Sequence, residues 1–342
     1  MLTAIFALVI LQSPPPREPL VVTRGLMGTR FQVALVGDDD TALEKLAREA
    51  LDEVERVERV LNNWLAASSI ALLNADASAG WRDVDPILAE VVAISLDFHA
   101  NSDGAFDITI APLLDASGFY SGERRELSST ELAALHGRIG SQWLRVERDP
   151  PRIRREKPGM QLDVSGMSKG FAVDRAVAVL RARGVTNAFV AGGSSTVYAL
   201  GRGVDGSGWP FFVGEGFAPE EWRLVDEAVG TSGRLAQSLT IDGATKSHII
   251  DVSHGGPVER DVAMAVFRCP TGTEADLTDT ALVAMGEARA RTWFAKRAQS
   301  GAWHDGKMRA ALLFLDAKAE RVGERVVRLS SAAPSAASPD PK

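Results

Sequence analysis

Apolar residues recur at spacings of three and four in several stretches of this chain, a pattern typical of helices that bury one face. The longest such stretch begins with Thr41 and Glu44, which have the spacing of a capping box. Gly184 and Gly286 follow amphipathic stretches where a helix is expected to end or break. The helices predicted in this way span 41–61, 86–98, Lys169-Gly170 to Gly184 and 274–285, with shorter ones over 68–74 and 128–136.

Short apolar runs bounded by glycine, proline and polar clusters predict strands. These runs span 20–26, 30–36, 143–146, 151–154, 187–191, 197–201, 211–213, 222–224, 229–233, 239–241, 263–268 and 308–314, and 105–110 is expected to be a strand or extended. Strands and helices do not alternate strictly, and no repeat of 20–50 residues is visible. The pattern therefore favours an α+β fold over a doubly wound one.

The stretch 162–193 contains the most suggestive arrangement of polar residues. It predicts a strand ending at Asp163, a small-residue turn over 165–168, a helix and a second strand. The turn would place the Asp163 carboxylate, Lys169 and free backbone groups at a helix N-terminus, where an anionic ligand is favoured. An ordinary strand-to-helix connection with a surface lysine has the same pattern, so both interpretations stay open.

Composition narrows the class of protein. The chain has 342 residues, which suggests one large or two medium domains, and 45% hydrophobic content is enough for a sizeable core. The net charge of −7, without a basic block, argues against nucleic acid as a partner. Cys269 is the only cysteine, so the chain has no internal disulfide framework and no cysteine-rich metal site.

The first residues resemble the apolar core of a signal peptide. Residues 2–11 are apolar or small, too few to span a bilayer comfortably, and the proline cluster at 14–16 follows. A basic region is missing at the start, and no cysteine follows that could carry a lipid anchor. We expect an exported protein, periplasmic or associated with the outer side of the inner membrane, without a transmembrane helix in its mature form; a cytoplasmic protein is the alternative.

Three polar or aromatic features are candidates for chemistry. Asp276 and Thr280 are one helical turn apart on the same face, and the spacing alone favours a solvated helix face. His248 lies in an otherwise apolar run, where a structural histidine is the commoner case. Trp64 follows the first long helix and is either a core aromatic or a stacking surface.

Taken in order, these pieces resemble the ApbE family, the FAD:protein FMN transferases. The matching motifs are MGT at 27–29, 68–74, AFDIT at 105–109, PL at 112–113, 163–174, GG at 192–193, SG at 232–233, SHIID at 247–251, AD at 275–276 and TA at 280–281. The resemblance implies an α+β fold related to the T-fold, with mixed sheets, packed helices and an active site in a cleft between two lobes. It implies one FAD-binding transferase domain over 20–329. The apolar run and prolines make 1–19 the expected leader and linker, and the Ser/Ala/Pro-rich residues 330–342 are expected to be a disordered tail.

The resemblance also implies a reaction. Members bind FAD and, with Mg²⁺, transfer its FMN part to a threonine hydroxyl of a target flavoprotein, releasing AMP. The implied metal ligands are Asp276, Thr280 and the backbone carbonyl of Gly166, while Asp279 matches a variant pattern that assists them. Lys169 matches a position that reaches the pyrophosphate, and His248 matches a histidine near the transferred phosphate, where it would accept or position the acceptor proton. The implied FAD contacts are Met27, Trp64, Ala105, Phe106, Asp107, Asp163 and Ile250.

Five departures from the family pattern surround the expected site. They are Ser69 in place of a glutamate, Ser117 in place of a tryptophan, Ser194 in place of an acid, Arg234-Leu235 in place of an acid or amide and an aromatic, and Val252-Ser253-His254 in the histidine motif. Two alternatives to the transferase therefore stay open. One is an FAD pyrophosphatase that gives FMN and AMP, and the other is a non-catalytic flavin-binding relative.

Overall fold

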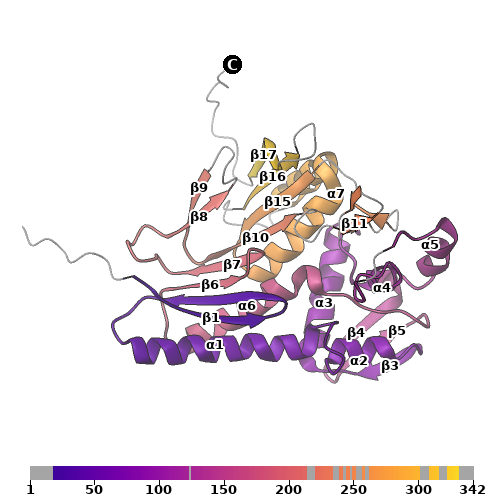
Figure 1. Ribbon diagram of the computed structural model, residues 1–342, viewed down its shortest axis with the longest axis horizontal. Helices are drawn as coiled ribbons and strands as arrows, with labels where there is room; N and C mark the ends of the chain where they lie inside the picture. Colours follow the sequence, from indigo (N-terminus) through magenta and orange to yellow (C-terminus); the bar gives the residue numbers. More distant parts are fainter. Residues whose placement is uncertain are drawn as a thin grey trace, which may run out of the picture.

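The computed structural model describes residues 18–122, 125–213, 220–233, 239–241, 244–246, 249–251, 256–258, 262–300, 308–315 and 322–330. Its largest element is an eight-stranded antiparallel sheet in the order β1-β2-β6-β7-β10-β15-β16-β17 (Figure 1). The strands are β1 (Leu20–Leu26), β2 (Thr29–Leu35), β6 (Ala188–Gly192), β7 (Thr196–Leu200), β10 (Glu227–Gly233), β15 (Val262–Cys269), β16 (Arg309–Leu315) and β17 (Val322–Ser330).

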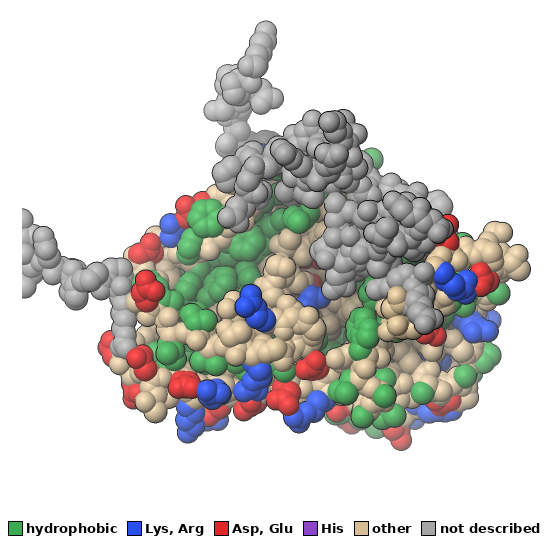
Figure 2. All heavy atoms as spheres, in the orientation of Figure 1, with side chains coloured by type: hydrophobic (Ala, Val, Ile, Leu, Met, Phe, Trp, Pro, Cys, Tyr) green, Lys and Arg blue, Asp and Glu red, His purple; other side chains and the backbone are tan. Residues whose placement is uncertain are grey.

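Three long helices pack against this sheet: α1 (Asp40–Leu61), α6 (Ser165–Ala182) and α7 (Gly272–Gln299). α1 contacts β1 and β2, α6 contacts β6 and β7, and α7 contacts β10 and β15. Apolar residues of these elements form the main core. A second apolar cluster joins the sheet to the hairpin of β8 (Trp209–Val213) and β9 (Glu220–Leu224), and Figure 2 shows apolar side chains gathered over this region.

A smaller region lies beside the large sheet, at the lower right of Figure 1. Its three-stranded sheet has the order β3-β5-β4, with β3 (Gly80–Asp83), β4 (Leu144–Arg148) and β5 (Pro151–Arg155), and α3 packs on β4 and β5. The helices here are α2 (Ser69–Ala75), α3 (Pro86–Asn101), α4 (Ala111–Ala116) and α5 (Ser129–His136), with 3-10 turns at Ile108–Ile110 and Ser141–Trp143. Two short ladders, β11 (Leu239–Ile241) with β12 (Ala244–Lys246) and β13 (Ile250–Asp251) with β14 (Gly256–Pro257), complete the described elements.

The α+β prediction is confirmed, and most predicted elements are present. The capping box predicted at Thr41 and Glu44 is wrong, because α1 begins one residue earlier and the Asp39 side chain accepts from the Ala42 N–H (3.0 Å). The helix break at Gly286 is confirmed: this residue has φ 69° and ψ 172°, and helical structure then resumes to Gln299. The sequence pattern missed that second half of α7, together with β3, α4 and β17.

The predicted strand and turn before α6 are wrong. α6 begins at Ser165, so the expected turn is its first helical turn. The N–H groups of Met167 and Ser168 both donate to the Val164 carbonyl (3.0 Å each), which closes that turn. Leu162 is held by a side chain instead of a strand neighbour, since its N–H donates to Asn74 Oδ1 and its carbonyl accepts from Asn74 Nδ2 (2.8 Å each).

Among the described residues, no helix has the length and apolarity to cross a membrane. Residues 1–17 and 331–342 lie outside the described residues, so the leader and the disordered tail stay predictions.

Candidate active site

The candidate site is built on a close contact between α6 and α7. A Cβ atom on Gly170 would overlap the Gly272 carbonyl, and one on Gly272 would lie 2.7 Å from the Gly170 carbonyl. Only glycine at both positions lets the two backbones approach this closely. As a result the Gly170 N–H reaches across to α7 and donates to Asp276 Oδ2 (2.9 Å).

Asp276 is held at both carboxylate oxygens. Oδ2 accepts from Gly170, and Oδ1 accepts from the hydroxyl of Ser195 (3.1 Å), the residue that precedes β7. The side chain is only 2% exposed. The solvated-face alternative for Asp276 is therefore wrong: this carboxylate points into the contact between α6, α7 and the sheet.

The start of α7 is fixed by a residue of α6. Asp174 accepts hydrogen bonds from the N–H groups of Gly272 (2.7 Å) and Thr273 (2.8 Å) and from the Thr273 hydroxyl (2.6 Å). Burial raises the pKa of the Asp174 carboxyl above its usual value, while the bonds from Thr273 and Gly272 oppose the rise. Asp174 thereby sets the position of α7, and with it the position of Asp276 relative to α6.

Thr280 lies one helical turn after Asp276 and meets two further elements. Its hydroxyl oxygen is 3.2 Å from that of Ser232 at the end of β10. A Cβ on Gly166 would lie 3.4 Å from Thr280 Cγ2 and 3.0 Å from Phe106 Cε2. Gly166 of α6, Thr280 of α7 and Phe106 are therefore in contact, and the three ligands implied by the family resemblance share one region.

Asp279 is a fully buried carboxyl beside these residues. Its Oδ1 accepts from the Thr280 hydroxyl (3.2 Å), and its Oδ2 has no hydrogen-bond partner within the described part of the chain. Oδ2 occupies the space where a side chain at Gly230 would stand, so a glycine there makes room for the acid. Burial raises the pKa of Asp279 well above its usual range, with the nearby Asp276 adding to the rise and Lys169 opposing it.

The residues present fit a hard divalent cation. A carboxylate, a threonine hydroxyl and a backbone carbonyl are all oxygen donors, the ligand type that Mg²⁺ prefers. Asp279 Oδ2, which lies against Gly230 of β10 and has no hydrogen-bond partner among the described residues, is a further buried oxygen on the same helix. Within the described ranges, no group of three or more His, Cys, Asp or Glu side chains is placed to hold a metal ion.

A second polar centre lies at the N-terminus of α6. Asp163 is 4% exposed; its Oδ1 accepts from the backbone N–H of Ser165 (2.8 Å) and from the Ser165 hydroxyl. Its Oδ2 accepts from Tyr120 Oη (2.6 Å) and from Asn63 Nδ2 (3.2 Å). Burial, and then the Asp163 charge, raise the pKa of Tyr120, so this phenol stays a hydrogen-bond donor. The Lys169 ammonium, on the first turns of α6, donates to the Ser165 carbonyl (3.3 Å).

Trp64 forms an aromatic cluster over this centre. Its ring centroid lies 5.3 Å from that of Tyr120 and 5.6 Å from that of Phe119. Trp64 is nevertheless 54% exposed, so the core alternative is wrong and one part of the indole faces outward. Ile250 is buried in the apolar cluster that contains Phe119, which connects this segment to the same aromatic group.

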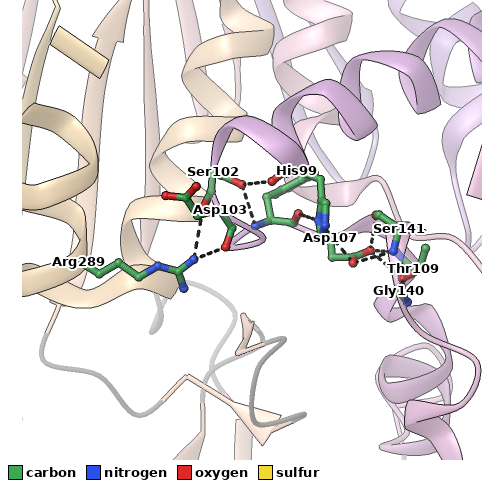
Figure 3. A network of polar contacts seen from close by, with 9 residues as sticks. His99, Ser102, Asp103, Asp107, Thr109, Gly140, Ser141 and Arg289 are labelled. Atoms are coloured by element: carbon green, nitrogen blue, oxygen red, sulfur yellow. Dashed lines mark hydrogen bonds and ion pairs between the residues drawn. The ribbon is translucent and has the colours of Figure 1, made fainter. Parts of the chain in front are cut away.

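Asp107 accepts four hydrogen bonds from Thr109 and Ser141 (Figure 3). Its Oδ1 accepts from the Thr109 N–H (2.8 Å), the Thr109 hydroxyl (2.7 Å) and the Ser141 hydroxyl (2.8 Å), while its Oδ2 accepts from the Ser141 N–H (3.1 Å). The bond from the Thr109 N–H to Asp107 caps the 3-10 turn over Ile108–Ile110, which replaces the second half of the strand or extended segment expected over 105–110. This geometry favours a role for Asp107 in holding Ala105 and Phe106, both 7% exposed, in place.

The remaining predicted residues are placed as follows. Met27 (φ 51°) and Gly28 (φ 70°) form the two-residue turn between β1 and β2, and the Met27 N–H donates to Glu58 Oε1 of α1 (2.8 Å). Ser194 is exposed in the β6–β7 turn, Ser69 opens α2 and Ser117 ends α4. His248 lies outside the described residues, as do Arg234-Leu235 and Val252-Ser253-His254, so these stay predictions.

Sequence reasoning missed four residues of this site: Gly170 as a contact point, Ser195, Asp174 and Tyr120. A glycine inside an amphipathic helical pattern, as at Gly170, was the available signal for close packing. The other three depend on contacts with distant parts of the chain.

A profile of the ApbE family matches residues 27–303. The chain belongs to the ApbE family. Among its ApbE relatives, the FAD:protein FMN transferase of Klebsiella pneumoniae is 26% identical over 289 residues, covering 81% of each chain. The FAD:protein FMN transferase of Escherichia coli strain K12 is 26% identical over 297 residues, covering 82% of this chain and 84% of the relative.

The fold of this chain also matches that of a solved ApbE structure. The crystal structure of the apo form of the Pseudomonas stutzeri flavinyl transferase ApbE superposes with a TM-score of 0.79 at 25% identity. The match covers 93% of this chain and 96% of that one. The mixed α+β architecture expected for an ApbE protein is therefore confirmed.

Proposed function

We propose that this protein is a Mg²⁺-dependent transferase that moves the FMN part of FAD to a threonine hydroxyl of a target flavoprotein and releases AMP. The observation that carries the proposal is the meeting of Gly166, Asp276 and Thr280 at the α6–α7 contact. It is supported by relatives named FAD:protein FMN transferases that match most of the chain.

In this reaction the threonine oxygen forms a bond to the phosphorus of the FMN phosphate. The bond from that phosphorus to the bridging oxygen breaks, the hydroxyl proton leaves, and AMP departs with the bridging oxygen. Mg²⁺, when bound by Asp276, Thr280 and the Gly166 carbonyl, would neutralise charge on the phosphoryl oxygens. His248 is proposed to accept or position the hydroxyl proton, for which an imidazole is suited.

The other residues bind and orient FAD in this proposal. Trp64 offers a half-exposed aromatic face to a ring of FAD, held against Phe119 and Tyr120. Lys169 supplies a positive charge at the N-terminal end of α6, where the helix dipole also favours the pyrophosphate. Asp163, fixed by Tyr120 and Ser165, contacts FAD at the same end of the helix.

We further propose that the acceptor is met outside the cytoplasm, in the periplasm or at the outer side of the inner membrane. The apolar run at 2–11, with the prolines that follow it, supports export. Cell fractionation of the full chain tests this: recovery with cytoplasmic markers only would overturn it.

The test of the proposed reaction is incubation of the purified protein with FAD and Mg²⁺, with and without a flavin-acceptor domain. AMP is measured by chromatography and the acceptor by mass spectrometry. We expect AMP release that depends on the acceptor, and an acceptor that carries one FMN. AMP with free FMN would favour the pyrophosphatase instead, and FAD bound unchanged with several acceptors would favour a flavin-binding relative without the chemistry.

A further inference from the structure

Ser195 is anchored by its backbone between two strands of the large sheet. It follows the tight turn at Gly193 (φ 63°), where a side chain would overlap the Thr29 hydroxyl. The Ser195 carbonyl accepts from the Thr231 N–H of β10 (2.6 Å), and the Ser195 N–H donates to the Gly192 carbonyl (3.3 Å). These two hydrogen bonds fix the backbone of Ser195, and the fixed backbone sets the direction of its side chain.

The Ser195 side chain completes the hydrogen bonding of Asp276. Its hydroxyl donates to Oδ1 (3.1 Å), while the Gly170 N–H donates to Oδ2 (2.9 Å). The two donors come from different places, one from the turn between β6 and β7 and one from α6. Together they fix the rotation of the carboxylate about its Cβ–Cγ bond, and each oxygen keeps a further lone pair for a cation.

The neighbouring strand repeats this arrangement for Thr280. Ser232, next to the Thr231 that binds the Ser195 carbonyl, shares a hydrogen bond with the Thr280 hydroxyl (3.2 Å). Each of the two α7 side chains of the site therefore has one serine partner, Ser195 in the turn before β7 and Ser232 in β10. Ser232 lies in a motif that carried the family resemblance, whereas Ser195 does not.

We propose that Ser195 is a positioning residue that holds the Asp276 carboxylate in the orientation needed to bind the divalent cation. The inference rests on the proposed function, because it takes Asp276 to be a metal ligand. Residues that hydrogen-bond to a metal ligand and orient it contribute strongly to metal affinity. Their removal typically weakens metal binding about 10- to 100-fold.

The experiment compares Ser195→Ala, Ser195→Thr and the unaltered protein. Ser207→Ala is the matched control, because it removes a serine-to-aspartate hydrogen bond (2.6 Å, to Asp205) in an exposed turn. Three quantities are measured. The first is the dissociation constant for Mn²⁺, which substitutes for Mg²⁺ and can be followed spectroscopically. The others are the dissociation constant for FAD in the presence of EDTA and the melting temperature.

We expect Ser195→Ala to weaken Mn²⁺ binding about 10- to 100-fold, with FAD binding in EDTA unchanged. Ser195→Thr, which keeps the hydroxyl, should restore most of the affinity, and Ser207→Ala should bind Mn²⁺ as the unaltered protein does. Mn²⁺ affinity within about twofold of normal in Ser195→Ala, whatever the change in melting temperature, would overturn the inference. If the unaltered protein bound no Mn²⁺ with or without FAD, the proposed metal-dependent function would be contradicted, and so would this inference.

Discussion

The backbone N–H of Gly170 donates to Asp276 Oδ2 across 2.9 Å, although the two residues are 106 positions apart in the chain. This bond joins α6, which carries Gly166 and Lys169, to α7, which carries Asp276 and Thr280. The geometry of the candidate metal site therefore depends on how closely the two helices approach.

Gly170→Ala tests that dependence. A helix interior normally gains about 0.5–1 kcal/mol from this replacement. Here the new methyl group would overlap the backbone carbonyl of Gly272, which cannot move aside as a flexible side chain could. We expect a net loss of about 1–3 kcal/mol in the free energy of unfolding, measured in urea, together with weaker metal binding. Gly25→Ala is the control, since no atom lies within 4 Å of the place its methyl group would take; equal effects of the two variants would contradict the explanation.

Trp64→Ala tests the exposed aromatic face. Stacking is worth about 0.5–1.5 kcal/mol, so we expect the FAD dissociation constant to rise about 2- to 10-fold, followed by flavin fluorescence. Phe212→Ala is the matched control, because Phe212 is also an exposed aromatic (56%, against 54% for Trp64) but lies on the β8–β9 hairpin. A similar loss of FAD affinity in both variants would show that Trp64 has no special role.

Asp107→Ala separates a structural role from direct contact with FAD. The change leaves buried N–H groups of Thr109 and Ser141 without their acceptor, at about 1–3 kcal/mol each. We expect a loss of more than ~2 kcal/mol in unfolding free energy, measured in urea. Asp115→Ala, on the exposed side of α4, is the control. Strong loss of FAD binding in a variant of normal stability would instead make Asp107 a direct contact.

Asp174→Asn should change how stability depends on pH. The pKa of Asp174 is raised in the folded protein, so the folded state holds this proton more tightly than the unfolded state does. Stability from this group is therefore greatest below the unfolded pKa of about 3.9 and declines as pH rises towards the folded pKa. The asparagine variant does not titrate and loses one acceptor oxygen at the start of α7, so it should be less stable throughout.

The difference in unfolding free energy between the protein and Asp174→Asn should consequently narrow as pH rises from about 4 to about 7. Urea unfolding at several pH values measures it, with Asp83→Asn, an exposed residue of β3, as the control for removing one carboxylate. A difference that widened over the same range would show that the sign of the pKa shift is wrong.

Periodicity and turn residues predicted much of this fold and the relative placement of one pair of residues in the candidate site. The spacing of Asp276 and Thr280 placed both on one turn of α7, and Gly286 marked the break in that helix. The burial of Asp276 was not predictable, because it depends on Gly170 and Ser195 from two other elements. The 3-10 turn at Ile108–Ile110 was missed for a related reason: Asp107 is bound to Thr109 and to the distant Ser141, and side-chain bonding there outweighs the strand propensity of the segment.

Asp276 is proposed to serve the metal-dependent transfer of FMN. Since Asp276 is buried and accepts two hydrogen bonds, Asp276→Asn is a better test than alanine, because it keeps the shape and removes the charge. The measurement is the rate at which an acceptor domain gains the mass of FMN, with FAD and Mg²⁺ present, for the unaltered protein and for Asp276→Asn. We expect steady transfer by the unaltered protein, none without Mg²⁺, and a loss of at least about 100-fold in the variant, the upper range for removing a group that supports a metal. Equal rates in the two proteins, or transfer that does not need Mg²⁺, would contradict the account.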